Sequence, residues 1–247
     1  MTVRVCILLL LTALLLPVIA SKGQAGGSQG KKSVVVLVGT ARLSIPAPFG
    51  FVEASEALPA LRKEAESFIY PGNELLAFFI PTEDFQDMVG GQDKPMNRYL
   101  FVQTLTHSKA SQVGADSFIQ TKNQYREMSN ERLGKAGEDV NRLMRDRGKD
   151  LSKYPEIYAG LSLGRMVGLG VIDETKRSIT LGMLGSIKYS GEGKKERIKT
   201  LVGAEVVLLI NGKVITAQMY NTYRSVDDFD WLKEMVRDWT RAVLGSN

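Results

Sequence analysis

Two apolar runs near the C-terminal end decide the fold: KTLVGAEVVLLI at residues 199–210 and KVITAQMYNTY at residues 213–223. Only Asn211 and Gly212 separate them. Both central residues of the tightest antiparallel turn must accept a positive φ, and the Asn-Gly pair does so readily. The segment therefore predicts a β-hairpin.

The segments on either side of this hairpin predict a further hairpin and a helix. Upstream, strand-like runs at 161–172 and 178–189 flank the polar turn DETKR at 173–177. Downstream, Ser225 is placed as the N-cap of a helix, with Asp228 three residues later as its capping partner. The apolar residues of this helix recur at helical spacing and form its expected buried face: Trp231, Leu232, Met235, Val236, Trp239 and Val243.

The N-terminal half predicts further strands and two short helices. The expected strands are β-branched or apolar runs at 33–45, 49–52, 74–80 and 98–106, the first continuing through Gly39-Thr40. Prolines at 46, 48 and 81 end two of them, because proline cannot lie in a central strand. Ser55 is the expected N-cap of the first helix, and Thr82 is the expected cap of a short helical turn that runs through Val89.

A long charged helix is predicted from about residue 115 to 148. Its few apolar residues form a narrow stripe on one face: Phe118, Tyr125, Leu133, Val140 and Met144. A stripe this narrow indicates a helix that lies over a sheet or protrudes. The alternative is a coiled-coil partner helix, although the run is short for that and contains glycines.

Together these segments predict a single α+β domain at residues 34–247, in which an antiparallel sheet is covered by helices. The run LSIPAPFGFV at 43–52, expected as an opening hairpin, the helix after it, and the closing hairpin and helix from Val206 to Val243 resemble the PsbP-like fold. That fold occurs in small lumenal and periplasmic accessory proteins. The resemblance is one of topology without a site motif, and it implies a sandwich used mostly for binding and assembly.

The first 20 residues have the three-part pattern of a secretory signal peptide. Arg4 supplies the positive start, and residues 6–16 are apolar except for Thr12. This run is too short for a membrane-spanning helix, which needs about 20 residues. Cleavage is expected between Ala20 and Ser21.

A flexible linker rich in Gly, Ser, Gln and Lys is expected at residues 21–33, and Ala25 within it is a second candidate cleavage position. The only cysteine, Cys6, precedes the apolar run, so the mature chain has neither a lipidated cysteine nor a disulfide. The sequence also lacks an Asn-x-Ser/Thr acceptor. We therefore expect a periplasmic or secreted protein with no integral membrane segment after cleavage.

The charge balance is mildly basic, with a net charge of +5. Nucleic acid is not an expected partner of an exported protein, whereas an anionic membrane face or envelope polymer is an alternative. The basic run Lys194, Lys195, Arg197 and Lys199 could contact such a partner. The simpler interpretation is that lysines on an exposed strand edge prevent edge-to-edge aggregation.

Three other patterns resemble catalytic, metal-binding or phosphate-binding sites. His107 is the only histidine, so it is better explained as a surface residue than as a general base or zinc ligand. Asp227, Asp228 and Asp230 resemble a cation cluster, but acidic residues also favour the helix start where they stand. The glycines expected inside strands are attributed to bulges and close packing, and not to a phosphate loop: Gly164, Gly168, Gly170, Gly182 and Gly185.

The sequence therefore predicts no catalytic residue, cofactor or metal ligand. The leading interpretation is a non-enzymatic binding or accessory protein of the cell envelope, with an unknown protein or envelope component as its partner. One alternative is a hydrolase with a serine–carboxylate site. The other is a carrier that holds an apolar ligand between sheet and helix.

Overall fold

The computed structural model describes residues 32–69, 72–92, 96–127, 162–164, 166–189 and 197–247. The predicted signal peptide, its cleavage site between Ala20 and Ser21, and nearly all of the predicted linker lie outside these residues. No helix within the described part of the chain has both the length and the apolar character needed to cross a membrane.

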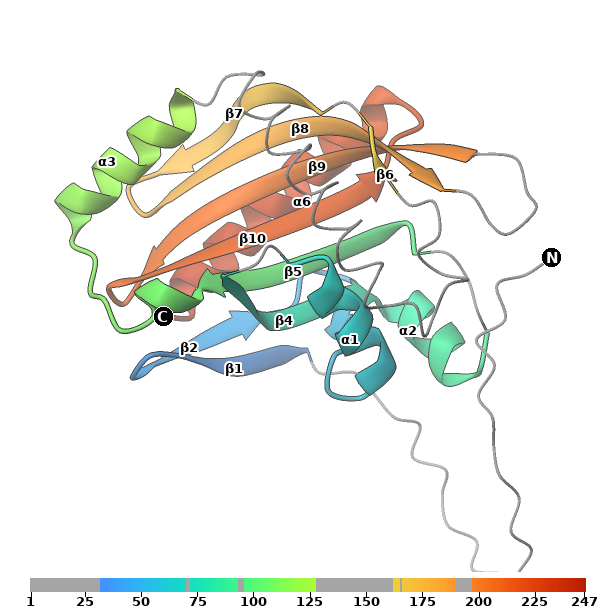
Figure 1. Cartoon of the computed structure of the whole chain (residues 1–247), viewed down its shortest axis with the longest axis horizontal. Helices are drawn as coiled ribbons and strands as arrows, with labels where there is room; N and C mark the ends of the chain where they lie inside the picture. The colour runs from blue at the N-terminus through green and yellow to red at the C-terminus, as the bar shows by residue number, and fades with distance from the viewer. Residues whose placement is uncertain (1–31, 70–71, 93–95, 128–161, 165, 190–196) are drawn as a thin grey trace, which may run out of the picture.

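Within these residues the fold is built on one antiparallel sheet of eight strands, whose order is β3-β4-β5-β10-β9-β8-β6, with β7 also pairing with β8 (Figure 1). In chain order the strands are β3 (Phe51–Glu53), β4 (Asn73–Pro81), β5 (Arg98–Leu105), β6 (Ser162–Leu163), β7 (Val167–Thr175), β8 (Ser178–Tyr189), β9 (Arg197–Ile210) and β10 (Lys213–Thr222). Helices cover both of its faces. The predicted α+β class, an antiparallel sheet covered by helices, is therefore confirmed.

The hairpin predicted at Asn211-Gly212 is confirmed as β9–β10. Ile210 pairs with Lys213 across a two-residue turn. Asn211 has a φ of 49° and Gly212 a φ of 74°, the positive values that this turn requires. Because β9 also pairs with β8 and β10 with β5, the hairpin forms the middle of the sheet.

We expect Gly212→Val to lower the free energy of unfolding by about 1–2 kcal/mol, because a β-branched residue is strained at positive φ. A Cβ built at this position would also lie 1.9 Å from Oε1 of Gln112. Gly212→Asn is the matched control, since asparagine tolerates this conformation and should cost much less. Equal urea denaturation midpoints for Gly212→Val and the wild type would contradict the strain argument.

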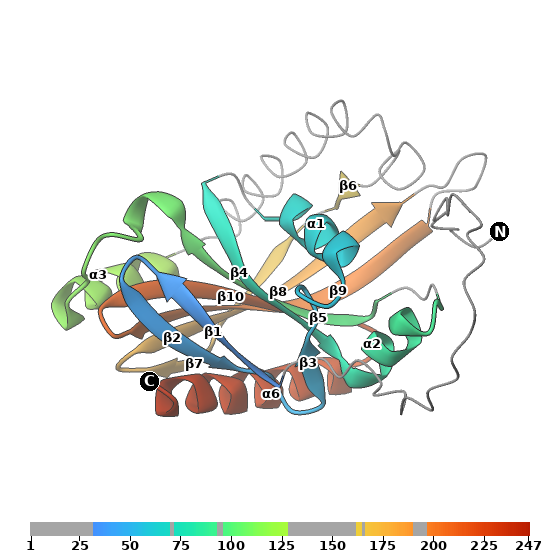
Figure 2. The ribbon, with the colours of Figure 1, turned by 90° about the horizontal axis from the view of Figure 1, so that it is seen from below.

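One face of the sheet packs against α6 (Val226–Gly245) and a separate two-stranded hairpin. Figure 2 shows α6 running along the sheet on the side opposite α1. The helix begins with the predicted capping box, in which Ser225 and Asp228 satisfy each other's backbone amides. Its fully or nearly fully buried side chains are Leu232, Val236, Trp239, Thr240 and Val243. The predicted apolar face is thus confirmed, with Trp231 and Met235 at its partly buried margin.

The separate hairpin corrects the expectation of one strand at residues 33–45. Residues Ser33–Val38 form β1 and residues Ala41–Pro46 form β2, and they pair only with each other in this structure's described part. The chain reverses at Gly39, whose φ of 62° favours glycine. The opening hairpin expected at 43–52 is also wrong, because β3 pairs with β4 and not with β2.

The opposite face of the sheet carries α1 (Pro59–Ser67), α2 (Thr82–Val89) and α3 (Ala115–Arg126). Both N-cap predictions on this face are wrong: Pro81 and not Thr82 is the N-cap of α2, and Leu58 and not Ser55 is the N-cap of α1. The helix begins at Pro59, which suits the first helical position because its missing N–H has no partner there in any case. Ser55 instead donates its hydroxyl to the Glu53 carboxylate, and both residues are buried.

The long charged helix is described only in its first part. The structure has α3 ending at Arg126 with Glu127 as its C-cap, and residues 128–161 of the predicted 115–148 segment lie outside the described residues. Phe118, the first residue of the predicted stripe, is buried against the sheet with Ile179 and Val207. The prediction that this segment lies over a sheet is confirmed for α3.

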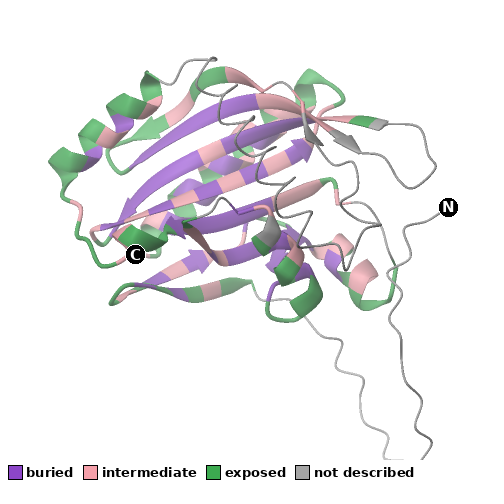
Figure 3. Cartoon of the chain, viewed as in Figure 1, coloured by how far each residue is buried: buried purple, intermediate pink, exposed green. Residues whose placement is uncertain are grey.

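Between the α1 and α3 regions, the side chains on the same face of the sheet are half-buried in the described part of the chain. On β10, every second residue from Lys213 to Asn221 is buried, while the residues between them are half-buried. Figure 3 shows this alternation as stripes along β10. The half-buried set includes Gln218 and Tyr220, and on the neighbouring strands Tyr99 and Glu205. We call these four residues the central strip.

Candidate functional site

The central strip is assembled by the register of three neighbouring strands. Gln218 of β10 pairs with Glu205 of β9, and Tyr220 pairs with Gly203 on one side and with Tyr99 of β5 on the other. Because alternate residues of a strand point to the same face, these side chains all stand on the side that carries α3. They thus form a polar and aromatic group in the middle of the sheet.

Glu205 is the one formally charged member of the strip. Its Oε1 accepts a hydrogen bond from the Tyr125 hydroxyl of α3 at 3.0 Å, and its Oε2 accepts one from Gln218 Nε2 at 3.4 Å. Both donors are neutral, and within the described residues no lysine or arginine forms an ion pair with this carboxylate. Burial raises the pKa of Glu205, and these two hydrogen bonds only partly oppose it.

The tyrosine rings lie beside this carboxylate. The centroids of Tyr99 and Tyr220 are 5.2 Å apart, with the rings tilted by 38°. Gly203 leaves room for the ring of Tyr220, because a Cβ at residue 203 would lie 2.9 Å from two atoms of that ring. Burial raises the pKa of Tyr99, and burial together with the charges of Tyr99 and Glu205 raises that of Tyr220, so both phenols stay neutral at neutral pH.

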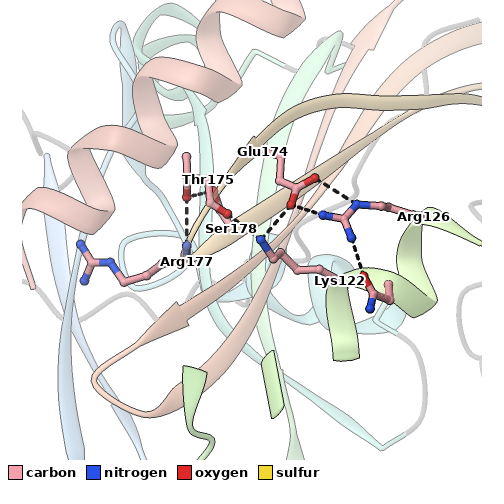
Figure 4. A network of polar contacts seen from close by, with 7 residues as sticks. Lys122, Arg126, Glu174, Thr175, Arg177 and Ser178 are labelled. Atoms are coloured by element: carbon pink, nitrogen blue, oxygen red, sulfur yellow. Dashed lines mark hydrogen bonds and ion pairs between the residues drawn. The ribbon is translucent and has the colours of Figure 1, made fainter. Parts of the chain in front are cut away.

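A network of polar contacts holds α3, and with it Tyr125, in place over the sheet (Figure 4). Nζ of the buried Lys122 donates to Glu174 Oε1 at 2.8 Å and to the carbonyl of Thr175 at 2.9 Å. Arg126, one turn further along α3, donates to the same carboxylate, with Nε 3.2 Å from Oε2. Hydrogen bonds from Lys122 and then Arg126 hold the pKa of Glu174 below its ordinary value. The C-terminal half of α3 is therefore fastened to β7 by charge, and Phe118 packs its N-terminal half against the sheet.

We expect Glu205→Gln to raise the melting temperature at pH 7. Burial raises the pKa of Glu205 in the folded protein above its value in the unfolded chain. The folded protein is therefore most stable below the unfolded-state pKa, and it loses this stability as the pH rises through the folded-state pKa. Glutamine keeps the shape of the protonated glutamate at every pH. Each kcal/mol gained corresponds to about 2–4 °C for a chain of this length.

Thermal unfolding from about pH 4 to pH 8 measures this effect, because the range spans the ordinary glutamate pKa and values above it. The advantage of Glu205→Gln should grow with pH and level off above the folded pKa. Asp238→Asn is the control, since Asp238 is 76% exposed and its charge should matter little. A variant less stable than the wild type at pH 7 would contradict the assigned cost of the charge.

The structure does not bring together the residues considered as catalytic or metal-binding candidates. His107 is exposed in the short turn η1 (Thr106–Ser108) that follows β5. Asp228 accepts hydrogen bonds from the backbone of Arg224 and Ser225, as a helix cap does. In the described ranges, no three His, Cys, Asp or Glu side chains are grouped so that they could hold a metal ion.

Gly168 and Gly170 lie in β7 and Gly182 and Gly185 in β8, with Gly164 directly after β6. These strands lead to other strands and not into a helix, and a register shift separates Gly168 from Gly170. The structural interpretation of the glycines is therefore confirmed. A phosphate loop would have to precede the N-terminus of a helix.

Of the basic run, Lys199 lies on a strand that the structure describes. It pairs with Ile187 of β8, and the described ladder between β9 and β10 begins only at Leu201, so the edge interpretation is not contradicted. Its Nζ donates to the carbonyl of Met96 at 2.9 Å and to Oδ1 of Asn97 at 3.2 Å, so it fastens the start of β5. Burial, and then the charge of Arg224, lowers its pKa. Lys194 and Lys195 lie outside the described residues.

The sequence interpretation missed Glu205, although it carried one signal. Glu205 is the only charged residue between Thr200 and Ile210, in a run that otherwise reads as buried strand. A charge in such a run is rarely tolerated without a partner or a function. Tyr99 and Tyr125 gave no comparable signal, because their nearness to Glu205 depends on the order of strands that are distant in sequence.

The comparisons with known proteins show no family. No family model matches the chain, and none of the curated proteins matches it either. Two solved structures resemble it weakly: a Mog1 E65A mutant, at 11% identity over 86% of this chain and 89% of that chain, and the Saccharomyces cerevisiae Ran-binding protein Mog1p, at 10% identity over 87% and 90%. The TM-score is 0.30 in both cases.

Proposed function

We propose that this chain is an exported, non-enzymatic binding protein of the cell envelope, and that it binds its partner on the central strip. The observation that carries the proposal is Glu205, a half-buried carboxylate with two neutral hydrogen-bond donors and no ion pair in the described part of the chain. A charge in this position costs stability. A binding role accounts for that cost, since a partner can supply the missing counter-charge.

The hydrolase alternative finds less support. Ser55 does contact the Glu53 carboxylate, but the exposed fraction is 4% for the serine and 3% for the glutamate. The same carboxylate also accepts the backbone N–H of Ser55 at 3.0 Å. These contacts fasten the chain between β3 and α1 and leave the hydroxyl out of a substrate's reach.

The carrier alternative, as first expected between sheet and helix, also finds less support. The side of the sheet facing α6 is filled by fully buried side chains, among them Val206, Leu208 and Ile215. That interface is the core of the fold. A small ligand is therefore better placed on the opposite face, at the central strip.

The export part of the proposal rests on the N-terminal sequence pattern and is tested by expression of the full chain in a bacterium. We expect the mature protein to begin at Ser21 and to be recovered from the periplasmic fraction without detergent. N-terminal sequencing identifies the cleavage position. A mature chain that retains Met1, or recovery only in detergent, would contradict export by cleavage.

The binding part is tested by affinity capture from the envelope fraction with three forms of the protein: wild type, Glu205→Gln and the control Asp238→Asn. We expect the component captured by the wild type to be lost with Glu205→Gln and retained with Asp238→Asn. Because Glu205→Gln is expected to be the more stable form, unfolding does not explain such a loss. Identical capture by all three forms would show that the central strip is not the binding surface.

A further inference from the structure

We infer that the ligand of the central strip is a small organic cation, an ammonium group with an apolar substituent, held between the Glu205 carboxylate and the rings of Tyr99 and Tyr220. The inference rests on the proposed binding function and names the chemical class that the strip recognises.

The charge of the strip calls for a cation. Among the described side chains that face the strip, Glu205 supplies the only carboxyl group: Tyr125 comes from α3, Gln218 and Tyr220 from β10, and the residue paired with Glu205 on β8 is the apolar Leu181. The two donors on the carboxylate are neutral, so within the described ranges its charge is hydrogen-bonded and has no cationic partner. One positive charge completes the site.

The aromatic rings select an organic cation. Neutral tyrosine rings present a negative π face, which attracts an ammonium group placed over it. Tyr99 and Tyr220 lie side by side on the same sheet face as Glu205, with their centroids 5.2 Å apart. On the β8 side, Met183 pairs with Gly203 and offers an apolar and polarisable surface for a substituent.

The donor set also argues for an ammonium group over a hard metal ion. Calcium takes about six to eight oxygen ligands, and magnesium requires a complete octahedron. Among the described residues the strip offers one carboxylate, and its remaining polar groups are phenols and an amide. An ammonium group needs far fewer oxygen contacts, because ring faces and methyl groups satisfy the rest of its surface.

Isothermal titration calorimetry with three probes of similar size tests the inference. Phenethylamine and benzyltrimethylammonium carry a positive charge, whereas 2-phenylethanol is the neutral analogue. We expect both cations to bind the wild type at least about tenfold more tightly than the alcohol, and Glu205→Gln to weaken the cations at least about tenfold. Asp238→Asn should bind all three probes as the wild type does. Tyr220→Leu should weaken benzyltrimethylammonium most, provided its melting temperature confirms that it is folded.

A second measurement locates the bound probe. The methyl resonance of Met183 should shift on addition of benzyltrimethylammonium, because Met183 lies beside Gly203 and Tyr220 on the strip. Met219 is the internal control, since it is fully buried on the opposite face of the sheet and should not shift. A shift at Met219 alone would overturn the location.

The outcomes separate this inference from the proposed function. Equal affinity for the alcohol and the amines, or no binding of either cation, overturns the ligand class. If the ligand class fails in this way but Glu205→Gln still loses the captured envelope component, the strip binds a partner of another chemical class and the proposed function stands. If capture is unchanged and no probe binds, both fail.

Discussion

Replacement of Trp239 by alanine is expected to lower the free energy of unfolding by about 3–5 kcal/mol, the usual cost of removing a large buried aromatic side chain. Trp239 lies on α6 with an exposed fraction of 2%. It belongs to the cluster that joins α6, the β1–β2 hairpin and the sheet. Its Nε1 also donates to the carbonyl of Pro46 at 2.8 Å, which ties α6 to the end of β2. Urea denaturation followed by circular dichroism measures the loss.

Two control variants divide this loss into its parts. Trp239→Phe keeps most of the ring volume but removes the hydrogen bond to Pro46. It should therefore lower the free energy of unfolding by less than Trp239→Ala does, and about 1 kcal/mol of its loss should come from the hydrogen bond. Arg241→Ala, two residues along the same helix, removes a side chain that is 69% exposed and should change stability by less than about 0.5 kcal/mol. An equal loss in Trp239→Phe and Trp239→Ala would mean that the hydrogen bond, and not the packing, dominates.

The C-terminal part of the fold could be predicted from the sequence because its signals are local. The Asn211-Gly212 pair fixes the turn, and the capping residues Ser225 and Asp228 fix the start of α6 within one residue. The 3.6-residue spacing then identifies Trp239 and Val243 as buried. Each of these features depends on residues a few positions apart.

The N-terminal errors have equally local causes that the sequence left ambiguous. Gly39 was interpreted as part of a continuous strand, but glycine gains most where the chain must adopt a positive φ, and here it turns β1 into β2. Ser55 has the right residue type for an N-cap. Pro59 competes for the helix start four residues later, and the carboxylate of Glu53 takes the serine hydroxyl.

The candidate site could not be predicted because it depends on strand order. Tyr99 reaches Tyr220 only because β5 pairs with β10 across more than a hundred residues of sequence, and Tyr125 reaches Glu205 only because α3 crosses the sheet. The contacts of Lys199 have the same origin. The groups that its Nζ contacts, the Met96 carbonyl and Asn97 Oδ1, are distant from it in sequence.

The attachment of α3 to the sheet contributes both to the stability of this fold and to its proposed binding function. Phe118 is completely buried between α3 and the sheet, together with Ile179 and Val207. Tyr125, which donates to Glu205, lies two turns further along the same face of the helix. Phe118 therefore sets the position from which α3 contributes to the central strip.

We expect Phe118→Ala to cost about 3–5 kcal/mol of unfolding free energy and to weaken binding at the strip, because the Tyr125–Glu205 contact loses its support. Ile119→Ala is the matched control. The Ile119 side chain, next to Phe118 in sequence, is 48% exposed, so its removal should change the free energy of unfolding by less than about 0.5 kcal/mol. Urea denaturation gives the first quantity, and calorimetry with benzyltrimethylammonium gives the second at a temperature where the variant is folded. If Phe118→Ala is as stable as Ile119→Ala, α3 is not anchored through Phe118. If it is destabilised but binds the probe unchanged, Tyr125 does not position Glu205, and the carboxylate and the sheet tyrosines act without α3.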